Sequence, residues 1–152
     1  MLQQQFGVPG QTNAVFTQTN EFIWGGDPSK IMILQKSCVI DGSARDAGHT
    51  SNTTVLRPGL ILGKITATGK IVEWDSGAVD GSETVYGILP VELVMVDPVS
   101  GSDADKVAPV VVWAPVKAKA LRIKGATMVG DGDEAAARTG LNAKRFMLDD
   151  EY

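Results

Sequence analysis

The sequence LRPGLILGKITATGKIVEWD, residues 56–75, contains the clearest strand and turn signals of the chain. Pro58-Gly59 favours a type II turn, because proline presets φ at about −65° and glycine accepts the positive φ that such a turn requires. Residues 60–65 then predict an apolar strand, and the Thr/Gly-containing segment 66–69 predicts a second turn. Residues 70–74 alternate polar and apolar side chains, as a half-buried strand does. This stretch therefore predicts two strands joined by a tight turn.

The chain continues on the C-terminal side as short apolar runs separated by loops rich in Gly, Asp and Ser. These runs predict strands, with Pro90 marking an edge or bend and Pro115 an interruption; the strands are expected at 85–89, 91–96, 107–113 and 116–123. Residues 134–138 predict a short helix with acidic residues at its positive end, and Gly140 is expected to end it.

On the N-terminal side, KIMILQKSCVI (residues 30–40) predicts a buried strand or strand pair, because it is rich in Ile, Leu and Val. Cys38 lies in this run and is expected to be a buried structural thiol. The small polar residues of 41–54 predict a surface loop. His49 falls inside that loop and is expected to be solvated.

Short strands at a spacing of roughly 8–12 residues indicate a mainly β fold with minor α structure. We expect a compact, small β-barrel or sandwich-like body with an extended N-terminal arm and a short C-terminal helix. The chain of 152 residues is long enough for one domain. We divide it into an arm, residues 1–29, and a β-rich domain, residues 30–152.

The arm has an unusual composition. Residues 1–26 contain a single charged side chain, Glu21, and hold three of the four Phe and one of the three Trp. A solvated tail normally shows the opposite bias. One interpretation is an arm that orders by docking aromatic side chains and pairing its backbone with a partner; the other is a strand packed on its own domain. The residues expected to contact a partner are Phe6, Val15, Phe16, Phe22, Ile23 and Trp24.

Composition excludes several classes of function. A net charge of −4 argues against general nucleic-acid or acidic-membrane binding. One cysteine and one histidine exclude an internal disulfide framework and a zinc site of several Cys and His ligands. The sequence offers neither an apolar span of membrane length nor a secretory signal. We expect an intracellular, reducing origin, in a cytoplasm.

The motifs that might carry chemistry are weak. Gly130-x-Gly132-x-x-Ala135 imitates a dinucleotide fingerprint, but acidic side chains would face the pyrophosphate. Asp131-x-Asp133 starts like a calcium loop, yet alanines follow at ligand positions. A nucleophilic enzyme would have to use His49, the only imidazole. We therefore expect no catalytic residue, metal, cofactor or small-molecule substrate.

Charge is segregated along the chain. Residues 70–108 hold eight acids and two lysines, whereas residues 114–124 hold four basic residues and no acid. Opposed patches would suit head-to-tail contacts in a ring of identical subunits. Two differently charged solvated faces are the other interpretation.

The middle of the chain resembles the lambda-type phage head decoration proteins. The resemblance rests on residues 56–75, on the loop AVDGSE (78–83) and on the strand TVYGIL (84–89), with a weaker continuation to residue 129. It implies a non-enzymatic late virion protein that binds the major capsid protein on the outer surface of the expanded head. It also implies a homotrimer at local threefold positions, which cements the shell against internal DNA pressure, with arms that add strands to the shell.

Two other functions remain open on the sequence. One is a different virion or tail structural protein with a similar β body. The other is a small enzyme, for example a hydrolase using His49. Neither has a sequence feature that favours it over capsid decoration.

Overall fold

The computed structural model describes residues 33–151, in which strands predominate. The strands are β1 (Leu34–Ile40), β2 (Val55–Leu56), β3 (Ile61–Lys64), β4 (Ile71–Glu73), β5 (Val85–Ile88), β6 (Leu93–Val94), β7 (Lys106–Trp113), β8 (Pro115–Lys117), β9 (Arg122–Ile123), β10 (Ala126–Thr127) and β11 (Met147–Asp149). A 3-10 helix, η2 (Ala118–Ala120), and an α-helix, α2 (Glu134–Ala143), are also present. The predicted class, mainly β with a short C-terminal helix, is confirmed. Neither described helix is long and apolar enough to cross a membrane.

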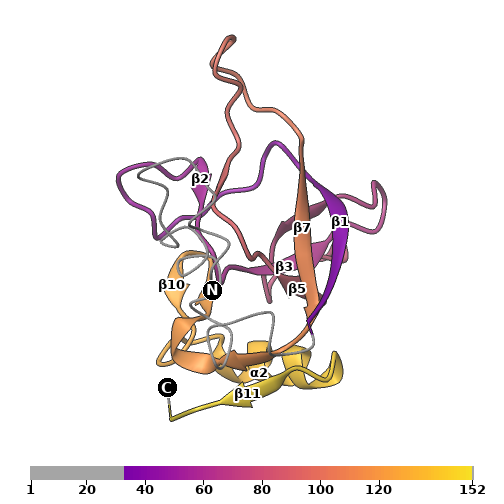
Figure 1. Ribbon diagram of the computed structural model, residues 1–152, viewed down its shortest axis with the longest axis vertical. Coiled ribbons are helices and arrows are strands. Elements are labelled where there is room, and N and C mark those ends of the chain that lie inside the picture. Colours follow the sequence, from indigo (N-terminus) through magenta and orange to yellow (C-terminus); the bar gives the residue numbers. More distant parts are fainter. Residues whose placement is uncertain (1–32, 152) are drawn as a thin grey trace, which may run out of the picture.

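Five strands close into a small barrel in the order β1-β4-β3-β5-β7, and β7 pairs back with β1. β1 and β7 run antiparallel along the full length of β1, from Leu34 opposite Trp113 to Ile40 opposite Lys106 (Figure 1). β3 and β4 form the predicted hairpin, with Lys64 opposite Ile71. The barrel form of the predicted body is therefore confirmed.

Both turns that were predicted within residues 56–75 are present. The Leu60 N–H donates to the Arg57 carbonyl at 3.4 Å, and Gly59 between them has a φ of 87°, as the third position of a type II turn requires. Gly69 closes the next turn with a φ of 73°, and its N–H donates to the Ile65 carbonyl at 2.8 Å. These local signals were readable because each turn is specified by residues adjacent in sequence.

Parts of β3, β5 and β7 in the barrel wall are buried on both faces. Adjacent residues of a strand point to opposite faces, and neighbouring residues here belong to different apolar clusters. Ile61 and Val111 belong to a C-terminal core, whereas Leu62 and Val110 belong to a barrel core. The C-terminal core also contains Trp74, Val116, Leu121, Met128, Leu141 and Phe146; the barrel core also contains Ile40, Leu56, Leu60, Ile71, Leu89 and Met95. Burial on both faces explains why the strands read as continuous apolar runs.

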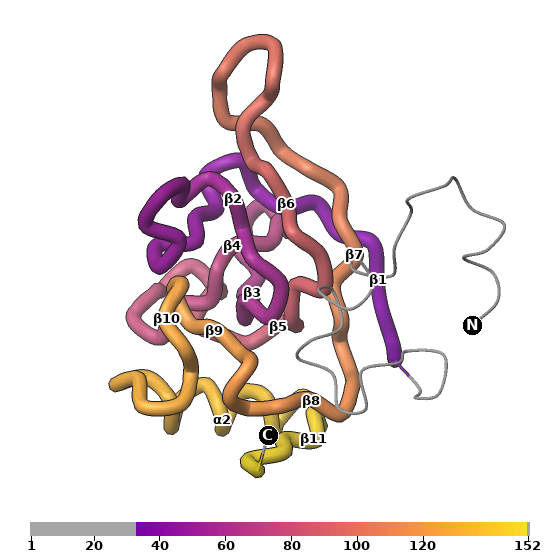
Figure 2. The backbone as a smooth tube through the Cα atoms, turned by 60° about the vertical axis from the view of Figure 1, so that its left-hand side comes forward, coloured from indigo at the N-terminus to yellow at the C-terminus, as the bar shows by residue number. Residues whose placement is uncertain are grey.

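The segment after β7 forms a layer that covers one end of the barrel. Figure 2 shows it folded beneath the strands, with α2 and β11 at the bottom. β8 and β11 pair in parallel, with Met147 opposite Pro115 and Leu148 opposite Val116. Parallel pairing needs a crossover connection, and η2, β9, β10 and α2 supply it.

Two predictions on the C-terminal side were wrong. The expected strand 116–123 is divided into β8, η2 and β9, at the point where Ala120 breaks the alternation of side chains. Helix α2 continues past Gly140 to Ala143. Gly140 is accommodated because it lies against the Val85 side chain, where a Cβ would come within 2.5 Å of Val85 Cγ2. The glycine therefore serves close packing of the helix on β5 instead of ending the helix. Strand β11 was not predicted.

The expected burial of residues 30–40 was also wrong for the part that the structure describes. Residues 34–37 of β1 are exposed and Cys38 is half-buried; only Ile40 is fully buried. The reason is that β1 pairs with β7 throughout but with β4 only at Ile40. The apolar composition of this run therefore does not reflect a core position.

Gly140→Leu tests the helix–barrel contact. The new side chain would overlap Val85 in the C-terminal core, and overpacking typically costs about 1–3 kcal/mol. We expect a loss of this size in the free energy of unfolding, measured by urea denaturation. Gly132→Ala is the matched control, because its Cβ meets nothing within 4 Å. Equal stability of the two variants would contradict the proposed role of Gly140.

Candidate functional site

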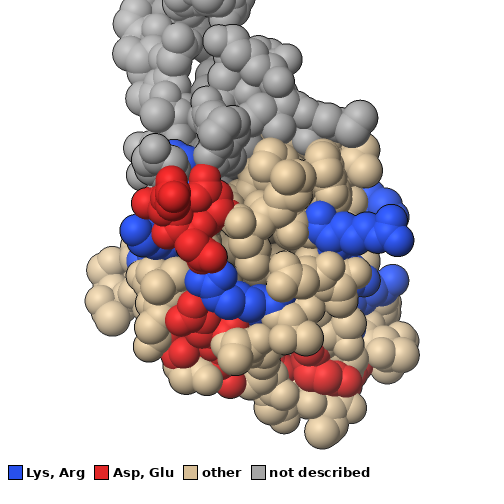
Figure 3. Space-filling model, turned by 90° about the horizontal axis from the view of Figure 1, so that it is seen from below, with Lys and Arg blue, Asp and Glu red and all other residues tan. Residues whose placement is uncertain are grey.

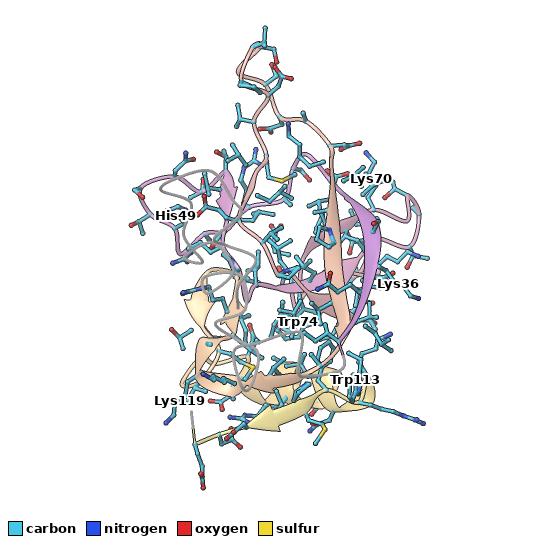
Figure 4. All side chains as sticks on the ribbon, viewed as in Figure 1. Lys36, His49, Lys70, Trp74, Trp113 and Lys119 are labelled. Atoms are coloured by element: carbon cyan, nitrogen blue, oxygen red, sulfur yellow. The ribbon has the colours of Figure 1, made fainter. Side chains whose placement is uncertain are left out.

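The side chains with catalytic potential are not assembled into a reactive group. His49 is half-buried, and among the described residues its ring bonds the Val55 carbonyl, 3.1 Å from Nδ1. Figure 4 places it in the loop at one side of the molecule, away from Trp74 at the centre. Cys38 Sγ lies 3.6 Å from the Tyr86 hydroxyl, a contact that, with burial, raises the pKa of Tyr86. The expected burial of the Cys38 thiol was wrong, because the residue is half-buried. Among the described residues, Cys38 and His49 form no hydrogen bond with each other.

The acidic segment 130–134 uses its polar groups locally. The Glu134 carboxylate accepts the Gly130 N–H at 2.7 Å, and the Asp131 carboxylate accepts the Asp133 N–H at 2.9 Å. Asp133 also accepts the Ser76 hydroxyl at 2.7 Å. Within residues 33–151, no group of three or more His, Cys, Asp or Glu is arranged to hold a metal ion. The N–H groups of Gly130 and Asp133 are thus engaged by carboxylates of the same segment.

A buried ion pair fastens three loops together. Asp46, with no exposed surface, accepts two bonds from the Arg57 guanidinium, at 2.6 and 2.9 Å, and one from the Arg57 backbone N–H at 3.1 Å. Arg57 also donates to the Gly125 carbonyl at 2.8 Å. Burial alone would raise the pKa of Asp46, but the bonds from Arg57 outweigh it and the pKa is lowered. An acid in this state is paired for structure and unsuited to proton transfer at neutral pH.

A second set of ion pairs braces a projecting hairpin loop, residues 95–104. The loop stands out at the top of the molecule in Figure 1. At its base, Asp103 pairs with Arg45, and the Asp105 carboxylate accepts from Lys70 at 2.7 Å and from the Gly42 N–H at 2.9 Å. The bond from Lys70 lowers the pKa of Asp105. The side chains of Asp103 and Asp105 nevertheless remain 51% and 45% exposed, so these ion pairs lie at the surface.

The separation of acidic and basic segments in the sequence is only partly kept in the folded structure. Lys124, from the basic segment, pairs with Asp75, from the acidic segment, at 2.6 Å. This bond lowers the pKa of Asp75 and raises that of Lys124. The two segments lie beside each other at this point because the turn after β9 reaches the loop after β4. They are therefore not two separate faces.

The surface next to the arm has an open strand edge. Along β1, the edge opposite to β7 is paired with a described strand only at Ile40, so no described strand lies beside the backbone from Leu34 to Val39 on that side. Two exposed valines, Val39 and Val107, also lie opposite each other on β1 and β7. An open edge beside apolar side chains can receive another extended segment.

All six residues predicted to contact a partner belong to the arm and lie outside the described residues. They are Phe6, Val15, Phe16, Phe22, Ile23 and Trp24. The first described residue, Ile33, packs against the C-terminal core. The body thus pairs several of its charged side chains internally, and near Ile33 one edge of β1 has no described partner strand.

A scan against protein-family models matches residues 39–145 to the bacteriophage lambda head decoration protein D family. The chain belongs to this family. The match extends the resemblance seen in the sequence on both sides, and it includes most of the barrel and all of α2. No curated protein and no solved structure matches the chain.

Family membership accounts for the chemistry of the body. The protein is a structural, non-enzymatic component of the phage capsid and sits on the surface of the virion head. Its paired carboxylates and half-buried His49 are therefore parts of a scaffold. Sequence reasoning missed the Asp46–Arg57 pair, since an Asp in a small polar loop carries no signal that an arginine eleven residues later will cover it.

The Asp46–Arg57 pair predicts a specific dependence of stability on pH. The pKa of Asp46 is lowered in the folded protein from its ordinary value of 3.8. The pair therefore stabilises the fold fully at pH values above 3.8, and this stabilisation is lost as the pH falls through the lower pKa of the folded state. Asp46→Asn should lower the free energy of unfolding by about 3 kcal/mol at neutral pH. The difference from the wild type should shrink below pH 3.8, as measured by urea denaturation.

Glu92→Gln is the matched control for this experiment, because Glu92 is exposed. It should leave the stability at neutral pH almost unchanged. A constant difference between wild type and Asp46→Asn across the acid range would show that the charge of Asp46 contributes nothing.

Proposed function

We propose that this decoration protein acts as a homotrimer at local threefold positions of the expanded head, and that it stabilises the shell against the pressure of packaged DNA. The partner is the major capsid protein. The observation that carries the proposal is the family match over residues 39–145. It favours the head over the tail as the place of binding, and neither an enzyme nor another virion role has an observation of its own.

The arm, residues 1–29, is the proposed capsid-binding element. Its lack of charge and its clustered aromatics support this role, because Phe and Trp bury apolar area worth roughly 25 cal/mol per Å². The open edge of β1 follows the arm directly in the chain. A segment that pairs its backbone with a partner strand would thus continue into a strand that is itself available for pairing.

Trimerisation would make the attachment tight. Three arms of one trimer bind neighbouring sites on a shell, and once one arm is bound the others act at an effective concentration set by their tethers. Avidity can exceed the affinity of one arm by about 10²–10⁴. A clamp that joins neighbouring capsomers in this way resists outward pressure without any reactive side chain.

Deletion of residues 1–26 tests the arm. We expect a folded body that no longer co-sediments with purified expanded capsids, because the apolar contacts are removed. A sharper pair of full-length variants replaces four arm aromatics or four arm glutamines with serine. The aromatic set should lose binding and the glutamine set should keep it; the sets are Phe6, Phe16, Phe22 and Trp24, and Gln3, Gln4, Gln11 and Gln18. Full decoration by the truncated protein would contradict the arm hypothesis.

Light scattering tests the trimer. The free or capsid-released protein should show three times the chain mass of 16.1 kDa. A monomeric mass in both preparations would refute the trimer. A monomer in solution that is released from capsids as a trimer would place assembly on the shell.

A further inference from the structure

An apolar strip crosses the pole of the body at which the arm is attached. Its four residues are Leu34, Trp113, Pro115 and Met147. Leu34 lies opposite Trp113 in the β1–β7 pairing, and Met147 lies opposite Pro115 in the β8–β11 pairing. Cross-strand partners project to the same face, so the two pairs are joined through the continuous segment 113–115. Figure 4 shows Trp113 at this lower end of the barrel.

The burial of the residues next to the strip in sequence shows to which side the side chains of the strip point. Ala114 and Val116 are members of the C-terminal core, and Ile33 and Leu148 pack against it. Because successive residues of a strand point to opposite faces, their neighbours in the strip point outward. The exposure agrees: Leu34 is 52% and Met147 60% exposed. The strip is therefore a surface feature produced by the same alternation that builds the core.

Charged side chains of opposite sign flank the strip. Lys36 follows Leu34 by two residues, and Lys144 and Arg145 shortly precede Met147. None of these three forms an ion pair with another described residue. The acidic residues 149–151 follow Met147 on the other side. Seen from below, basic side chains lie together on the right, whereas acidic and basic side chains alternate on the left (Figure 3).

The strip also lies where the body departs from the family model. The match covers residues 39–145, so Leu34 and Met147 fall outside it, while Trp113 and Pro115 fall inside. The described segments that the match leaves out at its two ends, 33–38 and 146–151, thus meet at one pole. Contacts made there can be specific to the partner of this chain.

We propose that the strip of Leu34, Trp113, Pro115 and Met147 is a second contact with the capsid shell, made by the body beside the arm. This rests on the proposed function. The occupant is an apolar patch on the major capsid protein with acidic side chains opposite Lys36, Lys144 and Arg145. Leu34 is the second described residue after the arm, so a shell surface that holds the arm lies within reach of the strip. In a trimer around a threefold axis, the neighbouring copies would lie at the sides of the body. The strip at this end would then face the shell and not another copy.

The test compares two double variants with the same change in charge. Leu34→Asp/Met147→Asp alters the strip, and Val79→Asp/Val99→Asp alters two loop valines that are 97% and 94% exposed. Both should keep the wild-type melting temperature, because all four side chains are on the surface. In co-sedimentation with purified expanded capsids, the strip variant should bind roughly tenfold or more weakly. The loop variant should bind like the wild type.

Three outcomes overturn the inference in distinguishable ways. Equal binding of the two double variants removes the strip from the shell contact. A lower oligomeric mass for the strip variant alone assigns the strip to a contact between copies. Failure of the wild type to bind capsids overturns the proposed function itself.

Oxidative footprinting of the unmodified protein gives a second measurement that needs no substitution. Met147, 60% exposed, should be oxidised readily in the free protein and protected on capsids. Unchanged oxidation on capsids would contradict the inference, as would protection already complete in the free oligomer.

Discussion

Strand β7 is buried on both faces at its centre, and this burial determines how the barrel and the C-terminal layer pack together. Its adjacent residues Val110 and Val111 point into different cores, while its two edges are taken by β1 and β5. Gly87 lets β5 approach closely, since a Cβ there would lie 2.5 Å from the Val111 carbonyl oxygen. A strand enclosed in this way needs cover on the side away from the barrel core. The C-terminal layer supplies that cover and is thereby part of the fold, not an addition to it.

The sequence predicted whatever is encoded by neighbouring residues. The predictions of turns at Pro58-Gly59 and at Gly69 were correct, because each turn is determined by its own residues. Gly140 misled because its packing partner, Val85, is distant in sequence. β11 was missed for the same reason, as it exists only through pairing with β8. The composition of residues 34–39 indicated burial, yet the second neighbour that would bury this strand reaches only Ile40.

The two parts of the candidate site, the arm and the strip, differ in the same way in how far the sequence predicts them. The arm was identified from composition alone, because its lack of charged residues and its clustered aromatic residues are visible in the sequence without knowledge of the fold. The strip could not be found in this way. Leu34 and Met147 lie at opposite ends of the described chain, and they share a face only after β1, β7, β8 and β11 have paired. A binding surface assembled across strands leaves no local motif.

The braced hairpin loop gives the molecule a distinct outer end. Its tip is internally hydrogen-bonded, because the Asp97 carboxylate accepts the N–H groups of both Val99 and Ser100 at 2.8 Å, and ion pairs hold its base. Figure 2 shows the tip at the end of the molecule opposite to β11. With the strip against a shell, a peptide inserted between Ser100 and Gly101 would point into the surrounding medium. The loop is thus a natural place to carry a label or an antigen on an assembled particle.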